Sequence, residues 1–317
     1  MLTLARRLSL AAAVGMLIVL LMGATVTKTG SGMGCGRSWP LCKGQFIPSY
    51  AFETLVEYSH RLVTSIEGFL LIGACIAAFR FRKQLPELNV LIPVTILTLI
   101  LQSGMGAAAV MWPQSAPVLA SHFGISLTAL ASTALMAFVL KEGPDRPARD
   151  DDAVPAKYRW WSFLVLVAMI VIAYLGAFVR HTKSSLACTT WPLCNGKVFT
   201  GLTWNETIVV VHRIVALLGV ILIVWMWQRS KAIAARPDLA RIGGIAAALI
   251  VIQALTGAML PLMRLSFAST MIHAMLMSIL FVVCAEWCRL ALPRPKLKTA
   301  SQPRMATGAG TVAPAAD

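Results

Sequence analysis

The sequence predicts an all-α integral membrane protein whose eight transmembrane helices form two tandem four-helix bundles. The first observation is composition: of 317 residues, 58% are hydrophobic and 13% are charged, and the mean hydropathy is +0.75. Soluble domains carry about 25% charged residues, so this composition indicates a lipid environment. The second observation is a series of long apolar runs, and the third is an internal repeat.

Each apolar run is close to the ~20 residues that an α-helix needs to cross the hydrocarbon core of a bilayer. The runs cover residues 9–26, 58–79, 89–110, 118–140, 160–179, 207–227, 243–260 and 267–290. The first run follows Arg6 and Arg7, as in a secretory signal. It is long for a signal core, however, and no clear A-x-A cleavage site follows it. We therefore expect the first run to be an uncleaved transmembrane span.

The basic residues are distributed unequally between the two sides of the predicted membrane. Of the 28 Lys and Arg residues, 19 lie in one set of connecting segments and 7 in the opposite set, and Arg61 and Arg213 lie just inside helices. This is the positive-inside pattern, and it predicts a multi-pass protein of the cell membrane with both termini in the cytoplasm. The positive charges behind the net charge of +15 thus determine how the protein is oriented in the lipid membrane, and no nucleic-acid partner is expected.

The internal repeat is visible as matched residues at a nearly constant interval. The interval is 153 from Cys35 to Cys188, 152 from Cys42 to Cys194, 152 from His60 to His212 and 151 from His122 to His273. A constant interval across unlike residue types indicates a duplicated unit. Because each unit has an even number of spans, both units face the same way. A pseudo-two-fold axis along the membrane normal should relate them.

The repeat divides the chain into four parts. Residues 1–140 form the first four-helix bundle and residues 160–290 form the second. The segment 141–159 between them is polar, contains three Pro residues and an acidic run, and is predicted to be a cytoplasmic linker. The tail, residues 291–317, is rich in Pro, Lys, Ala and Gly, and we expect it to be disordered.

Four of the five histidines occupy matched positions, near the predicted outer ends of the even-numbered spans. They are His60 and His122 in the first bundle and His212 and His273 in the second. Each lies roughly 5–9 Å from its helix start, so the two of each bundle share a depth. Two facing imidazoles can hold a haem iron from both sides. Hydrogen bonding to a neighbour or headgroup is the simpler alternative, and zinc or copper is another. The fifth, His181, is expected in a solvated loop.

One ionisable position breaks the repeat. Glu57 shares a helix face with His60 and Arg61, but the matched position in the second half is Val209. This asymmetry suggests that the first half performs chemistry while the second holds a cofactor. Glu57 could act as a general base, stabilise positive charge at an oxidised carbon, or simply pair with Arg61 at i+4. Arg61 and Arg213 could bind haem propionates or extend to lipid phosphate.

The remaining matched residues lie in the loops and on the odd-numbered spans. Cys42 and Cys194 each end a WPLC motif, and Cys35 and Cys188 precede these motifs, in loops on the predicted oxidising side. We expect a structural disulfide in each loop, with a redox-active first pair as the alternative. Gln102 with Gly106, and Gln253 with Gly257, supply small residues and an amide for close helix packing or for a flat macrocycle.

The EYSHR cluster, the paired loop cysteines, the four helix histidines and the four-plus-four layout resemble the haem A synthase family over roughly residues 9–290. The loop cysteines place the resemblance with the cysteine-bearing bacterial type. Enzymes of that family are oxidoreductases that convert the C8 methyl group of haem O to a formyl group by successive hydroxylations. The product, haem A, serves terminal oxidases.

The resemblance also implies roles for individual residues. His212 and His273 would ligate the iron of a haem b cofactor, and His60 and His122 that of the substrate haem O, with Glu57 as the catalytic carboxylate. Haem O synthase (protohaem farnesyltransferase) and the assembly of terminal oxidases would be the functional partners.

Two other functions remain open at this point. One is a non-catalytic di-haem b-type membrane cytochrome that transfers electrons. Such a protein has no use for Glu57, so the difference between Glu57 and Val209 counts against this function. The other is a transporter, because duplicated helical bundles are common among transporters. Four matched histidines at one depth suit iron ligation better than transport.

Overall fold

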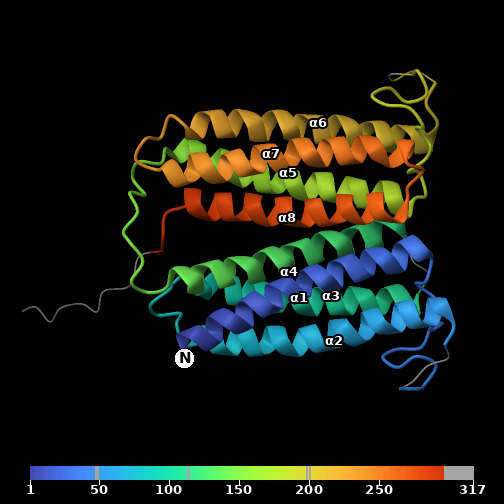
Figure 1. The fold of residues 1–317 in the computed structure, drawn as a ribbon, viewed down its shortest axis with the longest axis horizontal. Helices are drawn as coiled ribbons and strands as arrows, with labels where there is room; N and C mark the ends of the chain where they lie inside the picture. Colours follow the sequence, from blue (N-terminus) through green and yellow to red (C-terminus); the bar gives the residue numbers. More distant parts are fainter. Residues whose placement is uncertain (47–49, 113–114, 198, 200, 296–317) are drawn as a thin grey trace, which may run out of the picture.

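The computed structural model describes residues 1–46, 50–112, 115–197, 199 and 201–295. Within these residues it contains eight α-helices, each long and apolar enough to cross a membrane, and no β-strand (Figure 1). The helices are α1 (Leu2–Thr29), α2 (Phe52–Phe79), α3 (Leu88–Met111), α4 (Ala116–Glu142), α5 (Ala156–His181), α6 (Trp204–Ser230), α7 (Pro237–Leu262) and α8 (Phe267–Ala291). The predicted class, an all-α multi-pass membrane protein with eight spans, is confirmed.

The helices gather in two groups, α1–α4 and α5–α8, whose axes run side by side (Figure 1). In the first group α1 packs against α2 and α4, and α3 packs against α4; in the second, α5 packs against α6 and α8, and α7 packs against α8. This equivalent pairing is what a duplicated unit predicts. The two groups differ in one pair, because α6 packs along α7 much more extensively than α2 packs along α3. The symmetry axis itself stays a prediction.

Helix α4 lies at the centre of the molecule. It contacts α1 and α3 in its own group and α5 and α8 in the other. Nearly all of its side chains between Ser126 and Leu140 are buried. This stretch is rich in Ala, Ser and Thr, and small side chains allow neighbouring helices to approach closely where lipid provides no hydrophobic driving force. The small side chains of α4 therefore allow it to pack closely against helices of both bundles.

Partly buried ion pairs also join the bundles at the end opposite the cysteine loops. Arg146, just after α4, pairs with Glu87 at 2.6 Å and with Glu142 at 3.0 Å. Arg289 of α8 pairs with the same Glu142 and with Glu286 at 2.6 Å. Charges removed from water are stable only when they are paired in this way. Glu142 therefore connects the end of α4 to the end of α8.

The predicted segment boundaries shift by several residues. The segment between α4 and α5 spans residues 143–155, shorter than the predicted linker 141–159, because both helices continue past their apolar runs. Helix α8 extends to Ala291, and residues 292–295 follow it outside any helix. The predicted disorder of the tail concerns residues 296–317, which lie outside the described residues.

Candidate functional site

The two loops that carry the cysteines lie at the same end of the molecule, one at each group of helices (Figure 1). We call residues 30–51 the first cysteine loop and residues 182–203 the second cysteine loop. Disulfides join Cys35 to Cys42 in the first and Cys188 to Cys194 in the second, with the predicted pairing. The Trp–Pro peptide bond of each WPLC motif is cis. The duplication is therefore expressed in the loops as well as in the helices.

An arginine on the following helix holds each cysteine loop through the loop's backbone carbonyl groups. Arg61 of α2 donates to a carbonyl 2.8 Å away, and Arg213 of α6 donates to one 2.9 Å away. The acceptors are Ser38, Pro40 and Leu41 for Arg61, and Thr190, Pro192 and Leu193 for Arg213. Each acceptor pair is separated by the same interval of 152 residues. These loop contacts were not foreseen, and propionate binding by the two arginines stays a prediction.

Glu57 connects the first cysteine loop to α2. Its side chain is buried; Oε2 accepts a 2.8 Å hydrogen bond from the backbone amide of Cys35, and Oε1 forms an ion pair with Arg61. The i+4 ion pair considered from the sequence is therefore formed. A carboxylate that accepts a backbone N–H bond and faces a guanidinium is stabilised in its charged form. The matched Val209 is buried in an apolar cluster that includes the loop residues Cys188 and Cys194, and its side chain has no carboxylate to bond a loop amide or Arg213.

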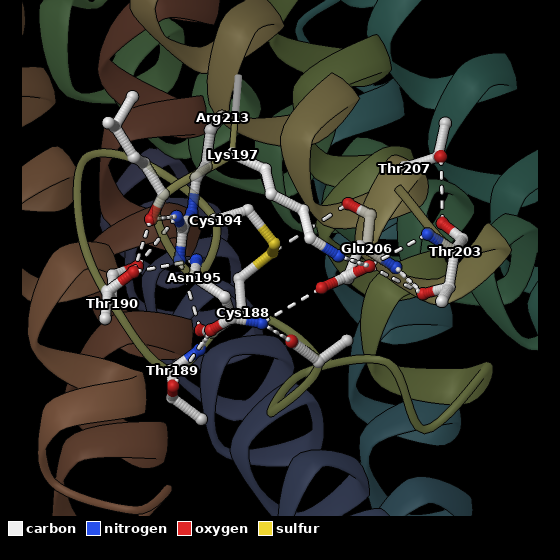
Figure 2. Close-up of a disulfide and its surroundings, with 12 residues drawn as sticks. Cys188, Thr189, Thr190, Cys194, Asn195, Lys197, Thr203, Glu206, Thr207 and Arg213 are labelled. Carbon is white, nitrogen blue, oxygen red and sulfur yellow. Dashed lines mark hydrogen bonds and ion pairs between the residues drawn. A yellow bond between two sulfur atoms is a disulfide. The ribbon is translucent and has the colours of Figure 1, made fainter. Parts of the chain in front are cut away.

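The second cysteine loop is anchored by a different carboxylate (Figure 2). Glu206, in the first turn of α6, forms a capping box with Thr203 and accepts a 3.0 Å hydrogen bond from the side chain of Asn195. Lys197 lies 3.5 Å from the same carboxylate. Sequence reasoning missed Glu206, although the spacing T-x-x-E before an apolar run is the known signature of a capping box. Its contacts all lie within the loop, so its role is structural.

Each of the four matched histidines packs against a glycine of the preceding helix. A Cβ atom built on that glycine would lie between 3.1 and 3.7 Å from Cε1 of the ring. The pairs are Gly23 with His60, Gly106 with His122, Gly176 with His212 and Gly257 with His273. The histidines thus lie on the even-numbered helices, as predicted, and the odd-numbered helices make room for their rings. Gly23 and Gly176 were missed, although their interval of 153 fits the repeat.

The ring nitrogens of these histidines are poorly satisfied by the protein. The Nδ1 atoms of His60, His122 and His212 are buried and have no hydrogen-bond partner in the described part of the chain. His273 differs, because the Thr256 hydroxyl lies 3.0 Å from its Nδ1 and the Gln253 amide 3.2 Å from its Nε2. Buried polar atoms without partners are rare in folded proteins and call for a missing partner.

These features fit a haem better than a bare metal ion. Among the described residues, no group of three or more His, Cys, Asp or Glu side chains is arranged to hold a metal ion. A haem brings four nitrogen ligands of its own and needs only one or two imidazoles from the protein. Two histidines per bundle, each with its ring accommodated beside a glycine, meet that need.

His181 differs from its prediction in position. It is the last residue of α5 and is partly buried, whereas the sequence suggested a solvated loop position. The helical hydrogen bonding of α5 continues beyond the predicted apolar run, and Thr182 is the C-cap of the helix.

Comparison with known proteins agrees with this geometry. The COX15-CtaA family model, described as cytochrome oxidase assembly protein, matches residues 47–285. The chain is 37% identical over 292 residues to a protein named heme A synthase from Symbiobacterium thermophilum, covering 91% of this chain and 95% of that protein. It is 38% identical over 314 residues to the heme A synthase of Geobacillus kaustophilus, covering 96% of each. With that of Alkalihalophilus pseudofirmus it shares 37% identity over 276 residues, 86% of this chain and 92% of the relative.

Proposed function

The chain belongs to the haem A synthase family, and from this premise we propose that its first bundle oxidises haem O while its second bundle holds haem b. The activity itself follows from the family: the protein is a membrane oxidoreductase that converts haem O to haem A. The reaction oxidises the C8 methyl group to a formyl group by successive hydroxylations. The division of labour between the bundles is the part that the sequence repeat and the site geometry support.

The second bundle is the better candidate for permanent haem binding. His212 and His273 would ligate the iron, with Gly176 and Gly257 leaving space for their rings. A bis-imidazole haem iron supplies one-electron transfer. The Thr256 hydroxyl beside Nδ1 fixes the orientation of the His273 ring, and such second-shell hydrogen bonds strengthen iron ligation.

The first bundle suits a haem that must enter and leave. His60 and His122 would bind the substrate, and their Nδ1 atoms have no partner in the described chain. The residue matched to Thr256 is Met105, whose thioether is a much weaker hydrogen-bond acceptor for the His122 ring than a hydroxyl group. Weaker orientation of the ligand lowers affinity, which a substrate site needs for release of its product.

Glu57 is the proposed catalytic carboxylate. Its bonds to the Cys35 amide and to Arg61 hold it in one position, about one helical turn before His60. Hydroxylation of a methyl group by water releases two protons and two electrons, and the electrons need an external acceptor. A fixed carboxylate can accept a proton in this step and can stabilise positive charge on the oxidised carbon. Arg61 would then have two roles, with Glu57 on one side and the first cysteine loop on the other.

The single observation that carries this proposal is the break in the repeat at Glu57. Both halves keep two histidines, an arginine that holds the loop and a disulfide, yet only the first half has a carboxylate at the position of Glu57. The second half has Val209 there, and its loop-anchoring Glu206 lies at a different position. A di-haem cytochrome for electron transfer has no need of this difference. We therefore favour chemistry in the first bundle over electron transfer alone.

The cellular setting is part of the same proposal. The charge distribution favours the cell membrane, with both termini in the cytoplasm and both cysteine loops outside. Haem O synthase would deliver the substrate, and the assembly of terminal oxidases would consume the product.

The test is haem extraction from a host that makes haem O but not haem A. The intact chain, Glu57→Ala and a control, Glu206→Ala, are expressed, and the extracted haems are separated by chromatography. We expect haem A or its hydroxylated precursor from the intact chain and the control, and neither from Glu57→Ala. Haem A from Glu57→Ala would remove Glu57 from the mechanism. Unchanged haem O with haem B from every folded chain would favour the cytochrome instead.

A further inference from the structure

A second carboxyl group lies deeper in the first bundle, where the proposed mechanism makes no use of it. Glu67 follows His60 on α2 by seven residues, which corresponds to about 10 Å along the axis and nearly the same helix face. Its residue exposure is 4%, and its Oε1 is buried with no hydrogen-bond partner among the described residues. A carboxyl group at this depth is costly and therefore needs a functional explanation.

The side chain of Glu67 packs against α1, inward of the His60 ring. Its carboxyl group lies on the backbone of Gly15 in α1, so closely that a Cβ atom there would be 1.9 Å from Oε2. The neighbouring residue Met16 is contacted through its sulfur, at 3.9 Å, by the amide nitrogen of Gln102 from α3. Helix α1 thus meets His60 at Gly23 and Glu67 two turns further inward, at Gly15.

The second bundle lacks this carboxyl group. The residue matched to Glu67 is Gly219, at the interval of 152 that also relates the histidines of α2 and α6. The space beside Gly219 is filled by Ile172 of α5, whose Cδ1 would lie 2.4 Å from a Cβ atom built on the glycine. The two proposed haem sites therefore differ at this depth, with a carboxyl group in one and only hydrocarbon in the other.

The two haems differ chemically in a corresponding way. Haem O carries a hydroxyethylfarnesyl group where haem b has a vinyl group, so only haem O presents a hydroxyl group at that edge of the ring. We propose that Glu67 selects haem O over haem b in the first bundle by hydrogen bonding this hydroxyl group. This inference rests on the proposed function, in which His60 and His122 bind the substrate. It adds a specificity-determining residue that is separate from the catalytic Glu57.

The direction of the Glu67 side chain supports this role. Side chains on a helix lean toward its N-terminal end, which for α2 is the end that carries His60. The His60 ring leans the same way, so the two groups stay about two helical turns apart, and both face α1. With its propionates at the outer end, where Arg61 could bind them, a macrocycle held at His60 would direct the opposite edge, which carries the farnesyl chain, toward the lipid-buried half of the bundle.

An unpaired carboxyl group also explains selectivity. A site built to hydrogen-bond a substrate hydroxyl rejects the analogue that lacks it, because the polar group of the site is then left buried and unsatisfied. Haem b in the first bundle would leave Glu67 in that state. In the second bundle, Gly219 and Ile172 impose no such penalty on a vinyl group.

The test is a competition between haem O and haem B for the first bundle. Purified intact protein and variants are loaded with haem O and challenged with excess haem B, and the bound haems are extracted and separated by chromatography. Glu67→Leu should lower the preference for haem O at least ten-fold. Glu67→Gln retains a hydrogen-bonding group and should keep the preference to within about three-fold. The control Ser9→Ala removes another buried, unpartnered polar group, on α1, and should leave the preference unchanged.

A further variant moves the carboxyl group without altering its chemistry. Gly15→Ala places a methyl group where Oε2 of Glu67 now lies, so it should also lower the preference for haem O. An unchanged preference in both Glu67→Leu and Gly15→Ala, with haem b still bound, would overturn the inference. If Glu67→Leu and Glu67→Gln both lost haem A formation but kept the preference for haem O over haem B, the inference would be wrong. Glu67 would then act in proton transfer instead. Failure of the intact chain to make haem A would instead contradict the proposed function.

Discussion

The backbone amide of Cys35 donates a 2.8 Å hydrogen bond to Oε2 of Glu57, so one contact joins the first disulfide to the carboxylate on α2. The same carboxylate pairs with Arg61, which in turn holds the carbonyl groups of the loop. The loop and the carboxylate therefore fix each other's position. If Glu57 has the proposed catalytic role, the cysteine pair would support catalysis by holding this carboxylate in position, without reacting itself.

Removing the first disulfide should therefore lower the rate of haem A formation more than it lowers the binding of haem. In the double variant Cys35→Ser with Cys42→Ser, the loop gains freedom and the amide no longer holds Glu57 in one position. We expect haem A formation to fall about ten-fold, as when a catalytic group loses its alignment, with haem b content unchanged. Haem chromatography and the Soret absorbance of the purified protein measure the two quantities.

The second disulfide provides the matched control. Cys188→Ser with Cys194→Ser loosens a loop that Asn195 and Glu206 still hold and that contacts no catalytic carboxylate. Any loss of haem A formation in this variant should follow its loss of haem b. An equal and selective loss of turnover in both double variants would contradict a role specific to the Cys35 amide.

A second prediction concerns the glycines that face the histidines. Gly176→Val places a branched side chain where even a Cβ atom would be only 3.1 Å from Cε1 of His212. The ring must move, so we expect the haem b content of purified protein to fall below half. Gly73→Val is the control, because Gly73 also lies within a helix but has open space around its Cβ position. Equal haem content in both variants would show that the contact has no effect on ligation.

Hydropathy and the repeat were sufficient to predict the helices, their number and the placement of the four histidines on alternate spans. They were not sufficient to predict helix ends. Helix α1 begins at Leu2, before the apolar run that starts at residue 9, because polar residues such as Arg6 are tolerated where a helix leaves the hydrocarbon. An apolar run marks the lipid-buried part of a helix only.

Contacts between helices were also beyond the sequence. Gly23 faces His60 because of how α1 and α2 are rotated about their axes, which a hydropathy pattern does not encode. Arg61 reaches loop carbonyl groups whose positions depend on the folded loop. Glu67 was overlooked because a single carboxyl group hardly changes the mean hydropathy of its run. Its importance emerged only from its burial against Gly15.

A third prediction concerns stability at the end opposite the cysteine loops. Arg289→Leu removes the cation that pairs with Glu142 and Glu286 and leaves their buried carboxylates with fewer partners. Breaking a buried ion pair from one side costs about 3 kcal/mol, so the midpoint of thermal unfolding followed by circular dichroism should fall by several degrees. Arg229→Leu is the control, because Arg229 is exposed and lies over the ring of Trp225. An equal shift in both variants would contradict the structural role of Arg289.

The last prediction concerns the difference in haem retention between the two bundles. Thr256→Val preserves the shape of the side chain but removes the hydroxyl group that lies 3.0 Å from Nδ1 of His273. The ring loses its fixed orientation, and loss of such a second-shell partner typically weakens metal binding 10–100-fold. We expect haem b to transfer to apomyoglobin at least ten-fold faster from this variant, with a shift in the midpoint potential that a purely structural change would not produce.

Met105→Thr is the converse change, because it offers His122 a hydroxyl group at the matched position, and it should slow the loss of haem O from the first bundle. If both variants released haem at the rates of the intact protein, hydrogen bonding to the ligand histidines would not explain why one bundle retains its haem while the other exchanges it.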